Sequence, residues 1–373
     1  MDPALTKERA VMRAIRRLVV LQPHGLGDML MTTPMLGGIR RSYPEVKVTV
    51  VCSSPAAAAL VAGMPLGAEA LVFDPSRSPL KNLGTLVLKL RRFRPDAFLV
   101  TPWMTPWKGE LLARLSGAPL RVGAQSWWPI GGYTHVVPRA QAVHKVEGHL
   151  EMARELFPDL KETPLIFPVP PEARAEARRF WRRFGFEGRP VLGVHPGGDH
   201  RNPNKIYPLE NYLKVIEGFL AAHPEAGCLI FLGPSEEGLQ KRIPQSSSRI
   251  QVTVRQRLPV TAALLGQVRV LLHSDTGLGH LAAAVKTPVV SIFGPGNPDI
   301  SEPRGELTRV VTLTPRLPCQ PCVYTRRYPK CRYNACLKDL APDLVLSAIM
   351  EMWRLATHTS DLIPEGSKAC TCH

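Results

Sequence analysis

A glycine-rich turn that carries an aspartate stands near the start of the chain. Gly25, Gly27 and Asp28 follow a short apolar run and come just before a helical pattern at residues 29–42. Glycines let a backbone pass close to a ligand, and the N-terminus of a helix favours anions. Asp28 could simply cap the helix, or it could act as a general base that faces a cleft. A dinucleotide fingerprint would need a third glycine where Leu30 stands, so we exclude dinucleotide binding.

A second glycine-rich turn lies in the middle of the chain. Gly197 and Gly198 follow an apolar run at residues 191–195, and Lys205 precedes the next helical pattern. Backbone N–H groups in such a turn, together with a lysine, suit a phosphate. The alternative is an ordinary turn with a solvated lysine.

The most informative motif is the segment 274–284, which follows an apolar strand pattern directly. Asp275 and Thr276 can cap the helix that begins there, and Thr276 and Gly277 expose N–H groups at its start. His280 lies one turn further on, where it could bind a ligand or could simply be packed. Open α/β sheets bind ligands at the carboxyl ends of their strands. The motif therefore predicts an anion site.

Four cysteines cluster near the end of the chain, at positions 319, 322, 331 and 336. Four thiolates can close a tetrahedral Zn²⁺ site, so Cys319, Cys322, Cys331 and Cys336 are candidate ligands of a structural zinc ion. The outer spacing is shorter than in the usual paired motifs, and free thiols or a disulfide remain alternatives.

The elements that position these residues alternate between strand and helix patterns. Short apolar runs and longer helical patterns follow one another, which is typical of βαβ units and a largely parallel sheet. Five prolines between residues 157 and 172 mark a linker. We therefore expect an α/β fold with two domains at residues 1–165 and 172–340, then an amphipathic helix at 342–357 and a flexible tail at 358–373.

Composition narrows the class of protein. The chain has 373 residues, 45% of them hydrophobic and 21% charged, which is ordinary globular usage. We find no apolar run long enough for a membrane helix and no secretion signal, and we expect a cytoplasmic protein. The formal charge of +16 suits an anionic partner such as a nucleotide or an anionic membrane surface.

Taken together, the motifs resemble glycosyltransferase family 9, the ADP-heptose:lipopolysaccharide heptosyltransferases and their relatives. The resemblance rests on the turn at 25–28, on residues 194–198 with 205–208, and on the segment 274–284 with the strand and loop at 287–295. These motifs stand in the family's order and span residues 17–340.

The resemblance implies a GT-B fold, with two Rossmann-like domains that carry parallel sheets and face a central cleft. The first domain would bind the acceptor and the second the nucleotide-sugar. In this fold the last helix usually packs back on the first domain, and residues 342–357 are the candidate for it. The family inverts the anomeric centre in one displacement and needs no metal for its chemistry.

The resemblance also implies roles for single residues. Asp28 matches the catalytic base, and Lys205 the lysine near the donor phosphates. Further donor contacts are expected from the second glycine turn, the helix tip and an acidic residue after strand 228–232: Gly197, Gly198, Glu236, Asp275, Thr276, Gly277 and His280. Acceptor contacts are expected from Gly25, Gly27 and His24. Relatives often carry a similar cysteine-rich stretch, which indicates a structural feature of the family.

The sequence departs from the family pattern in two places. The family usually has an arginine followed by a small or polar residue before the first turn, where Gln22, Pro23 and His24 stand here. His24 could contact the acceptor or tune Asp28. Gly279 stands where many members carry a bulkier residue.

Two further patterns concern surfaces. The first domain contains four tryptophans: Trp103, Trp107, Trp127 and Trp128. We expect them to pack in the core, and the alternative is that they line an acceptor groove. Arginine clusters are solvated surface by default, and the alternative is peripheral contact with an anionic membrane at its inner face.

The sequence thus predicts an inverting glycosyltransferase. It would move a sugar, ADP-heptose being the expected donor, to a glycan or lipid-linked glycan acceptor of the cell envelope, with no nucleic-acid partner. The alternatives are a nucleotide-binding regulator or RNA-binding protein on the same scaffold and a nucleotide-sugar epimerase.

Overall fold

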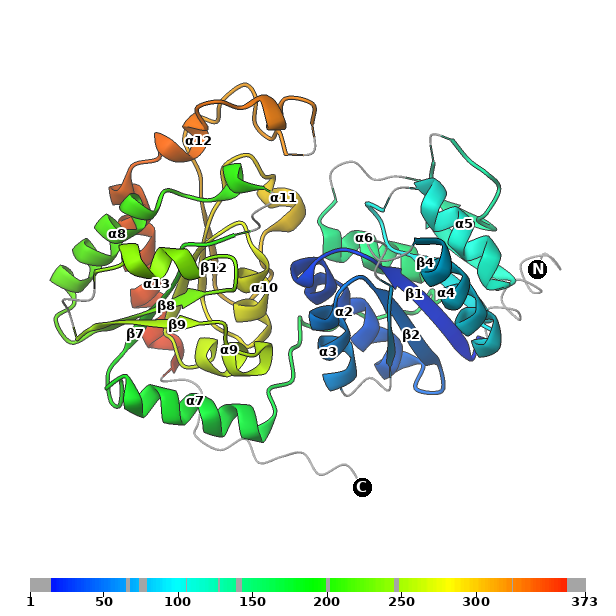
Figure 1. The fold of residues 1–373 in the computed structure, drawn as a ribbon, viewed down its shortest axis with the longest axis horizontal. Helices are drawn as coiled ribbons and strands as arrows, with labels where there is room; N and C mark the ends of the chain where they lie inside the picture. The colour runs from blue at the N-terminus through cyan, green and yellow to red at the C-terminus, as the bar shows by residue number, and fades with distance from the viewer. Residues whose placement is uncertain are drawn as a thin grey trace. The chain divides into compact units, whose positions relative to one another are not determined.

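The computed structural model describes residues 15–64, 68–73, 79–104, 106–126, 128–138, 143–198, 202–244, 248–323 and 325–360. The chain forms two compact units (Figure 1). The first unit comprises Met1–Pro168 with Asp299–Ser301, and the second Val169–Pro298 with Glu302–His373. The chain passes from one unit to the other inside the proline-rich segment.

The first unit is built on a six-stranded parallel sheet in the order β3-β2-β1-β4-β5-β6. Five of the six residues of β1 are buried, as expected of a central strand covered on both faces. The elements are β1 (Arg17–Gln22), α2 (Leu26–Ser42), β2 (Lys47–Cys52), α3 (Pro55–Gly63), β3 (Glu69–Val72), α4 (Pro79–Phe93), β4 (Ala97–Val100), α5 (Pro106–Ser116), β5 (Leu120–Ala124), β6 (His135–Val137) and α6 (Lys145–Arg154).

The second unit repeats this design with the strand order β12-β11-β10-β7-β8-β9. Its elements are α7 (Pro171–Arg183), β7 (Val191–His195), η1 (Pro203–Lys205), α8 (Leu209–Ala222), β8 (Gly227–Leu232), η2 (Glu237–Arg242), β9 (Ile250–Val254), α9 (Leu258–Leu265), β10 (Val270–Ser274), α10 (Gly277–Ala284), β11 (Val289–Ile292), β12 (Thr308–Val311), η3 (Tyr328–Lys330), α12 (Ala335–Lys338) and α13 (Pro342–Ser360). The short helix α11 (Pro298–Ser301) lies between β11 and β12 in the chain, and its last three residues are grouped with the first unit.

Both sheets have the Rossmann order, so the predicted α/β fold with two Rossmann-like units is confirmed. In the first unit the order reverses between β1 and β4, and in the second between β7 and β10. Ligands bind α/β sheets at the carboxyl ends of strands, at such a switch point. The turns after β1, β7 and β10 carry the three motifs singled out from the sequence.

The last helix, α13, contributes to the core of the second unit, where its buried face packs against α8 and β10 to β12 (Figure 1). This apolar face includes Ile349 and Trp353. That residues 342–357 also pack back on the first domain stays a prediction. The helix includes the first residues of the expected tail 358–373, and residues 361–373 lie outside the described part of the chain.

Candidate active site

In the first unit, Asp28 occupies the first turn of α2, directly after the carboxyl end of central strand β1. The Asp28 side chain does not cap the helix: the N-cap is Gly25, which has extended backbone and no side-chain hydrogen bond. An added Cβ at Gly25 would meet no described atom within 4 Å, so the turn leaves open space beside it. The half-buried carboxylate is therefore available for other partners.

The partner of Asp28 is Lys145, the first residue of α6. Lys145 Nζ donates to Asp28 Oδ1 at 2.6 Å, and the two side chains are 11% and 24% exposed. Burial by itself would raise the pKa of Asp28, but the charge and hydrogen bond of Lys145, with smaller contributions from His24 and His149, hold this pKa below its ordinary value. Asp28 is thus an ionised carboxylate with one oxygen fixed by a lysine.

A buried polar network braces this turn. Gln22 Nε2 donates to Thr32 Oγ1 at 2.8 Å and lies 3.4 Å from His149 Nε2. Thr32 Oγ1 in turn donates to the carbonyl oxygen of Asp28 at 2.8 Å. Burial lowers the pKa of His149 to about 4, so that its ring is neutral. Gln22 therefore positions the turn without adding a charge.

Trp103 completes this side of the unit at the carboxyl end of β4. Its ring meets His149 edge-on at 5.8 Å between centroids, and Lys145 Nζ lies 5.7 Å from its centroid. The backbone of Trp103 has φ +68°, a left-handed conformation that non-glycine residues adopt at a cost and that tends to mark functional positions. Gly148 makes room for the ring, because an added Cβ there would lie 2.7 Å from it.

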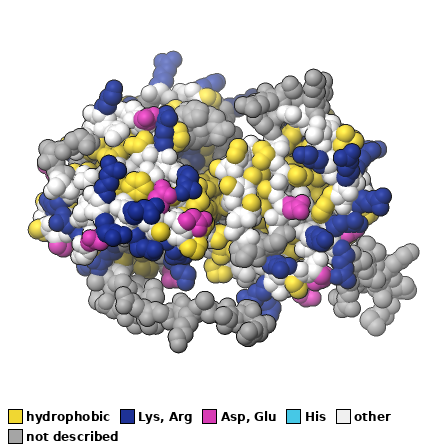
Figure 2. All heavy atoms as spheres, turned by 60° about the horizontal axis from the view of Figure 1, so that its bottom comes forward, with side chains coloured by type: hydrophobic (Ala, Val, Ile, Leu, Met, Phe, Trp, Pro, Cys, Tyr) yellow, Lys and Arg dark blue, Asp and Glu magenta, His cyan; other side chains and the backbone are white. Residues whose placement is uncertain are grey.

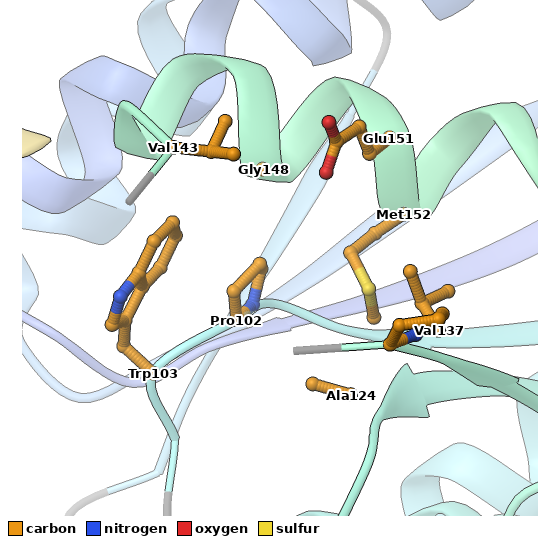
Figure 3. A pocket seen from close by; sticks show the side chains of 9 residues that line it. Pro102, Trp103, Ala124, Val137, Val143, Gly148, Glu151 and Met152 are labelled. Atoms are coloured by element: carbon orange, nitrogen blue, oxygen red, sulfur yellow. The ribbon is translucent and has the colours of Figure 1, made fainter. Parts of the chain in front are cut away.

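A small cavity of about 60 Å³ opens beside this ring (Figure 3). It lies between Trp103 and the residues of α6, with Glu151 and Met152 on its helical side. The tryptophans expected in the core are largely at the surface: Trp103 is 37%, Trp107 47% and Trp128 82% exposed. Core packing is thus wrong for these three, whose side chains are too exposed for a core position, and Trp127 lies outside the described residues.

His24 stands beside the same carboxylate. Burial lowers its pKa, opposed by the charge of Asp28, so the ring is mainly neutral at pH 7. Its Nε2 atom is buried and has no hydrogen-bond partner among the residues described. A buried nitrogen without a partner costs free energy unless a ligand or water satisfies it, which supports a ligand contact.

In the second unit, the central feature is a second lysine–aspartate pair. Lys205 ends η1, and its Nζ lies 2.6 Å from Oδ2 of Asp275, with the side chains 18% and 10% exposed. Asp275 directly follows β10, next to Ser274, whose hydroxyl accepts from the backbone N–H of Tyr207 at 3.0 Å. The strand end and the loop after β7 are thereby held together, so Lys205 and Asp275 meet at the switch point.

The tip of α10 lies beside this pair. Thr276 is its N-cap, with extended backbone and no side-chain cap, and the helix begins at Gly277. The Thr276 hydroxyl oxygen is buried and unpartnered within the described ranges. His280 is 96% buried one turn into the helix. The helix tip therefore offers N–H groups and a hydroxyl to an anion.

Gly197 and Gly198 are required where they stand. An added Cβ at Gly197 would lie 2.3 Å from Cγ of Glu236, and one at Gly198 would lie 2.8 Å from Ile206. Glu236 is buried and accepts from the N–H of Gly233 at 2.8 Å and from the Ser235 hydroxyl. The predicted donor residues Gly197, Gly198, Lys205, Glu236, Asp275 and Thr276 are thus gathered at one end of this sheet.

Sequence reasoning missed Lys145, His149 and Trp103. Lys145 is 117 residues from Asp28 in the chain, and a lone lysine at a helix start carries no recognisable spacing. Trp103 was noticed as an aromatic residue but was assigned to the core. The only available signal was its place after a short strand that proves to be the switch partner of β1.

The four cysteines divide into two buried and two exposed thiols. Cys322 and Cys336 are buried, Cys319 and Cys331 are exposed, and all four are free. No three His, Cys, Asp or Glu side chains of the described residues already converge as a metal site. Within the described ranges, no helix has the length and apolar character needed to cross a membrane.

Comparison with known proteins shows which family the chain belongs to. The model of glycosyltransferase family 9 (heptosyltransferase) matches residues 88–331. Lipopolysaccharide heptosyltransferase 2 of Escherichia coli K12 is 24% identical over 80% of this chain and 88% of its own length. Lipopolysaccharide heptosyltransferase 3 of the same strain is 27% identical over 72% and 79%, respectively.

Solved structures agree on the fold. A family 9 glycosyltransferase from Veillonella parvula has a TM-score of 0.76 at 19% identity, covering 91% of this chain and 97% of its own. E. coli ADP-heptose lps heptosyltransferase II has a TM-score of 0.71 at 20% identity, covering 91% and 99%. With the family model matching well over half of its length, this chain belongs to glycosyltransferase family 9, the heptosyltransferases.

Proposed function

We propose that this glycosyltransferase transfers heptose from ADP-heptose to a saccharide of the lipopolysaccharide core. The observation that carries the proposal is the pair of sites at the two switch points: the lysine-held carboxylate of Asp28 in one unit and the Lys205–Asp275 pair at a helix tip in the other. One supplies a base and the other a cradle for a leaving diphosphate. Family membership favours transfer over the epimerase and RNA-binding alternatives.

The donor is bound by the second unit. Lys205 and the N–H groups at the start of α10 lie where the Thr276 hydroxyl has no hydrogen-bond partner among the described residues. They stabilise the negative charge that builds up on the departing diphosphate, as preorganised donors do. This positive charge comes from the chain itself, so we propose metal-independent transfer. Asp275 accepts from hydroxyl groups of the sugar, and Glu236 contacts the nucleoside.

The acceptor is activated by Asp28 in the first unit. Oδ1 is fixed by Lys145, so Oδ2 receives the proton of the acceptor hydroxyl. The acceptor oxygen forms its bond to the anomeric carbon as the bond from that carbon to the diphosphate oxygen breaks. A single displacement of this kind inverts the anomeric configuration, and one positioned carboxylate suffices as the base. His24 and Trp103 provide a hydrogen-bonding and an apolar contact for the acceptor.

The lipid to which the acceptor saccharide is linked brings the enzyme to the inner face of the membrane. Lys and Arg side chains outnumber acidic ones on the face drawn in Figure 2, in keeping with the net charge of +16. In the first unit, Trp107 of α5 and Trp128 are both exposed. The loop after Trp128 is tied to α5, because Glu110 accepts from the N–H groups of Ile130 and Gly132 at 2.7 and 3.3 Å. Aromatic and basic side chains together suit an anionic interface.

A thermal-shift titration with ADP, GDP, UDP, CDP and dTDP tests the donor assignment. A ligand that binds only the folded state adds RT ln(1 + [L]/Kd), about 2.7 kcal/mol at a hundredfold excess over Kd. We expect ADP to raise the melting temperature selectively, and Lys205→Ala to abolish that rise. A selective shift with another diphosphate would contradict the ADP-heptose assignment, and no shift with any of them would contradict the proposed function.

A further inference from the structure

The four clustered cysteines line one cavity in the second unit. It has a volume of about 160 Å³, and Cys319, Cys322, Cys331 and Cys336 all contribute to its wall. The buried Cys322 and Cys336 and the exposed Cys319 and Cys331 therefore line one common space.

The segment that carries them contains little secondary structure. Between Val311 at the end of β12 and Ala335 at the start of α12, the only helix or strand among the described residues is the short η3. Loops of this length without secondary structure are uncommon in compact domains. Small segments that cannot bury a core of their own are held by disulfides or metals, and the four cysteines described here form no disulfide.

The charge of this segment also calls for an anionic partner. Residues 315–338 contain six basic residues and no acidic one: Arg316, Arg326, Arg327, Lys330, Arg332 and Lys338. A divalent ion bound by four thiolates carries a net charge of −2. Such a centre would offset the repulsion among these side chains, whereas four neutral thiols would not.

We propose that Cys319, Cys322, Cys331 and Cys336 bind one thiophilic divalent metal ion, zinc or ferrous iron, as a tetrathiolate site. Four thiols lose their protons to solvent as four metal–sulfur bonds form, and no electron is transferred. Zinc–sulfur bonds are about 2.3 Å long. Since no three described ligands converge beforehand, the exposed Cys319 and Cys331, which lie outside helices and strands, must move toward the buried pair.

The site would also fix the donor-binding loop. Cys322 donates its backbone N–H to the carbonyl of Pro295 at 2.9 Å, and Gln320 Nε2 donates to that of Gly294 at 2.6 Å. Gly296 follows Gly294 by two residues, and an added Cβ at Gly296 would lie 2.5 Å from Oδ2 of Asp275. The cysteine segment is therefore fastened to the backbone that lies against the Lys205–Asp275 pair.

Metal analysis of the purified full-length protein tests the proposal. We expect about one equivalent of zinc or iron per chain by inductively coupled plasma mass spectrometry, as a single four-ligand site requires. An iron tetrathiolate absorbs visible light when oxidised and a zinc one does not, which distinguishes the two ions. Titration of the wild-type protein with an organic mercurial should release the metal in step with the modification of about four thiols.

Variants locate the ion. Cys319→Ser and Cys331→Ser alter exposed residues and should lose the metal. Cys52→Ser is the matched control: its Sγ already donates to the carbonyl groups of Ser54 and Leu71, as a serine hydroxyl can, and it should keep the metal. The double variant Cys370→Ser/Cys372→Ser should keep it too. Wild-type protein without metal, or metal lost only from the double variant, would overturn the proposal.

Discussion

At the scale of single residues, the central balance is between burial and charge at Asp28. Burial disfavours the carboxylate, and Lys145 at 2.6 Å restores it. A base must remain ionised when the acceptor arrives, and it must also present a free oxygen. The charge of Lys145 keeps Asp28 ionised. Because the lysine binds Oδ1, it leaves Oδ2 for the acceptor hydroxyl. Lys145 is therefore a positioning residue.

Replacing Lys145 by Met should raise the pKa of Asp28, because the charge that lowers it is removed and burial remains. A nearby opposite charge lowers a carboxyl pKa by roughly 1–3 units. The acidic limb of the kcat/KM profile should therefore move to higher pH by at least about one unit. Lys145→Arg, which keeps the charge, should restore most of the original profile. A Met variant with an unchanged acidic limb would remove Lys145 from this role.

His149 should make the first unit sensitive to acid. Its pKa is about 4 in the folded protein and about 6.5 when unfolded. Between these two pH values the unfolded chain binds more protons than the folded protein does. The contribution of His149 to the free energy of unfolding is therefore fully present above pH 6.5 and declines as the pH falls toward 4. Each unit of difference is worth ~1.4 kcal/mol, so we expect a loss of a few kcal/mol.

Urea unfolding of wild type and His149→Gln from pH 7 to pH 4 measures this effect. The variant should be less stable at pH 7, because its fit in the network is imperfect, but its stability should fall less steeply with acid. Parallel curves for the two proteins would show that His149 does not contribute to the pH dependence.

At the scale of elements, the sequence predicted the parts that are buried and periodic. Residues 17–22, 191–195 and 289–293 read as strands because they are mostly apolar, and the interior strands β1, β7 and β11 lie there. The edge strands β3 and β6 carried no such signal, since they are short and largely exposed or half-buried. Local patterns also cannot say which sheet a helix joins, so the packing of α13 in the core of the second unit could not be read from the sequence.

Some residues of the candidate site could be predicted from the sequence and others could not. Residues in turns directly after predicted strands, such as Asp28 and Asp275, could be found, because the topology of parallel sheets brings strand ends together. Lys145 and Trp103 could not, because their roles depend on α6 packing against α2 and on an unusual backbone conformation after the end of β4.

Gly279 illustrates how an element is adapted. An added Cβ would lie 2.0 Å from the ring of His273, which is held by Ser291 Oγ at 2.8 Å and by the carbonyl of Ser274. The buried histidine therefore occupies the space that a side chain at position 279 would need. Gly279→Ala should destabilise the protein by about 1–3 kcal/mol, as overpacking does.

Differential scanning calorimetry or urea unfolding checks this value. Gly238→Ala is the matched control, because an added Cβ there meets none of the described atoms within 4 Å; it should change stability by less than about 0.5 kcal/mol. Equal effects of the two substitutions would show that the His273 ring can move aside at little cost.

At the scale of the whole molecule, the excess of basic residues should direct the protein to anionic lipid. We expect co-sedimentation with vesicles that contain phosphatidylglycerol and not with neutral phosphatidylcholine vesicles, weakened by 0.5 M salt because screening shortens the reach of charge. The double variant Trp107→Ser/Trp128→Ser should bind more weakly. Leu344→Ser, which removes an exposed apolar residue of the second unit, should bind as wild type does, and equal loss in both variants would refute a specific contact.

The most direct test of the account is acceptor-dependent release of ADP from ADP-heptose, measured for wild type and Asp28→Asn with a heptose-deficient lipopolysaccharide core as acceptor. We expect turnover by the wild-type protein only when both substrates are present. We expect kcat of the variant to fall by about a hundred- to ten-thousandfold, typical of removing a general base, while ADP still raises the variant's melting temperature as in wild type. Turnover by Asp28→Asn near the wild-type rate, or no acceptor-dependent release by the wild type, would contradict it.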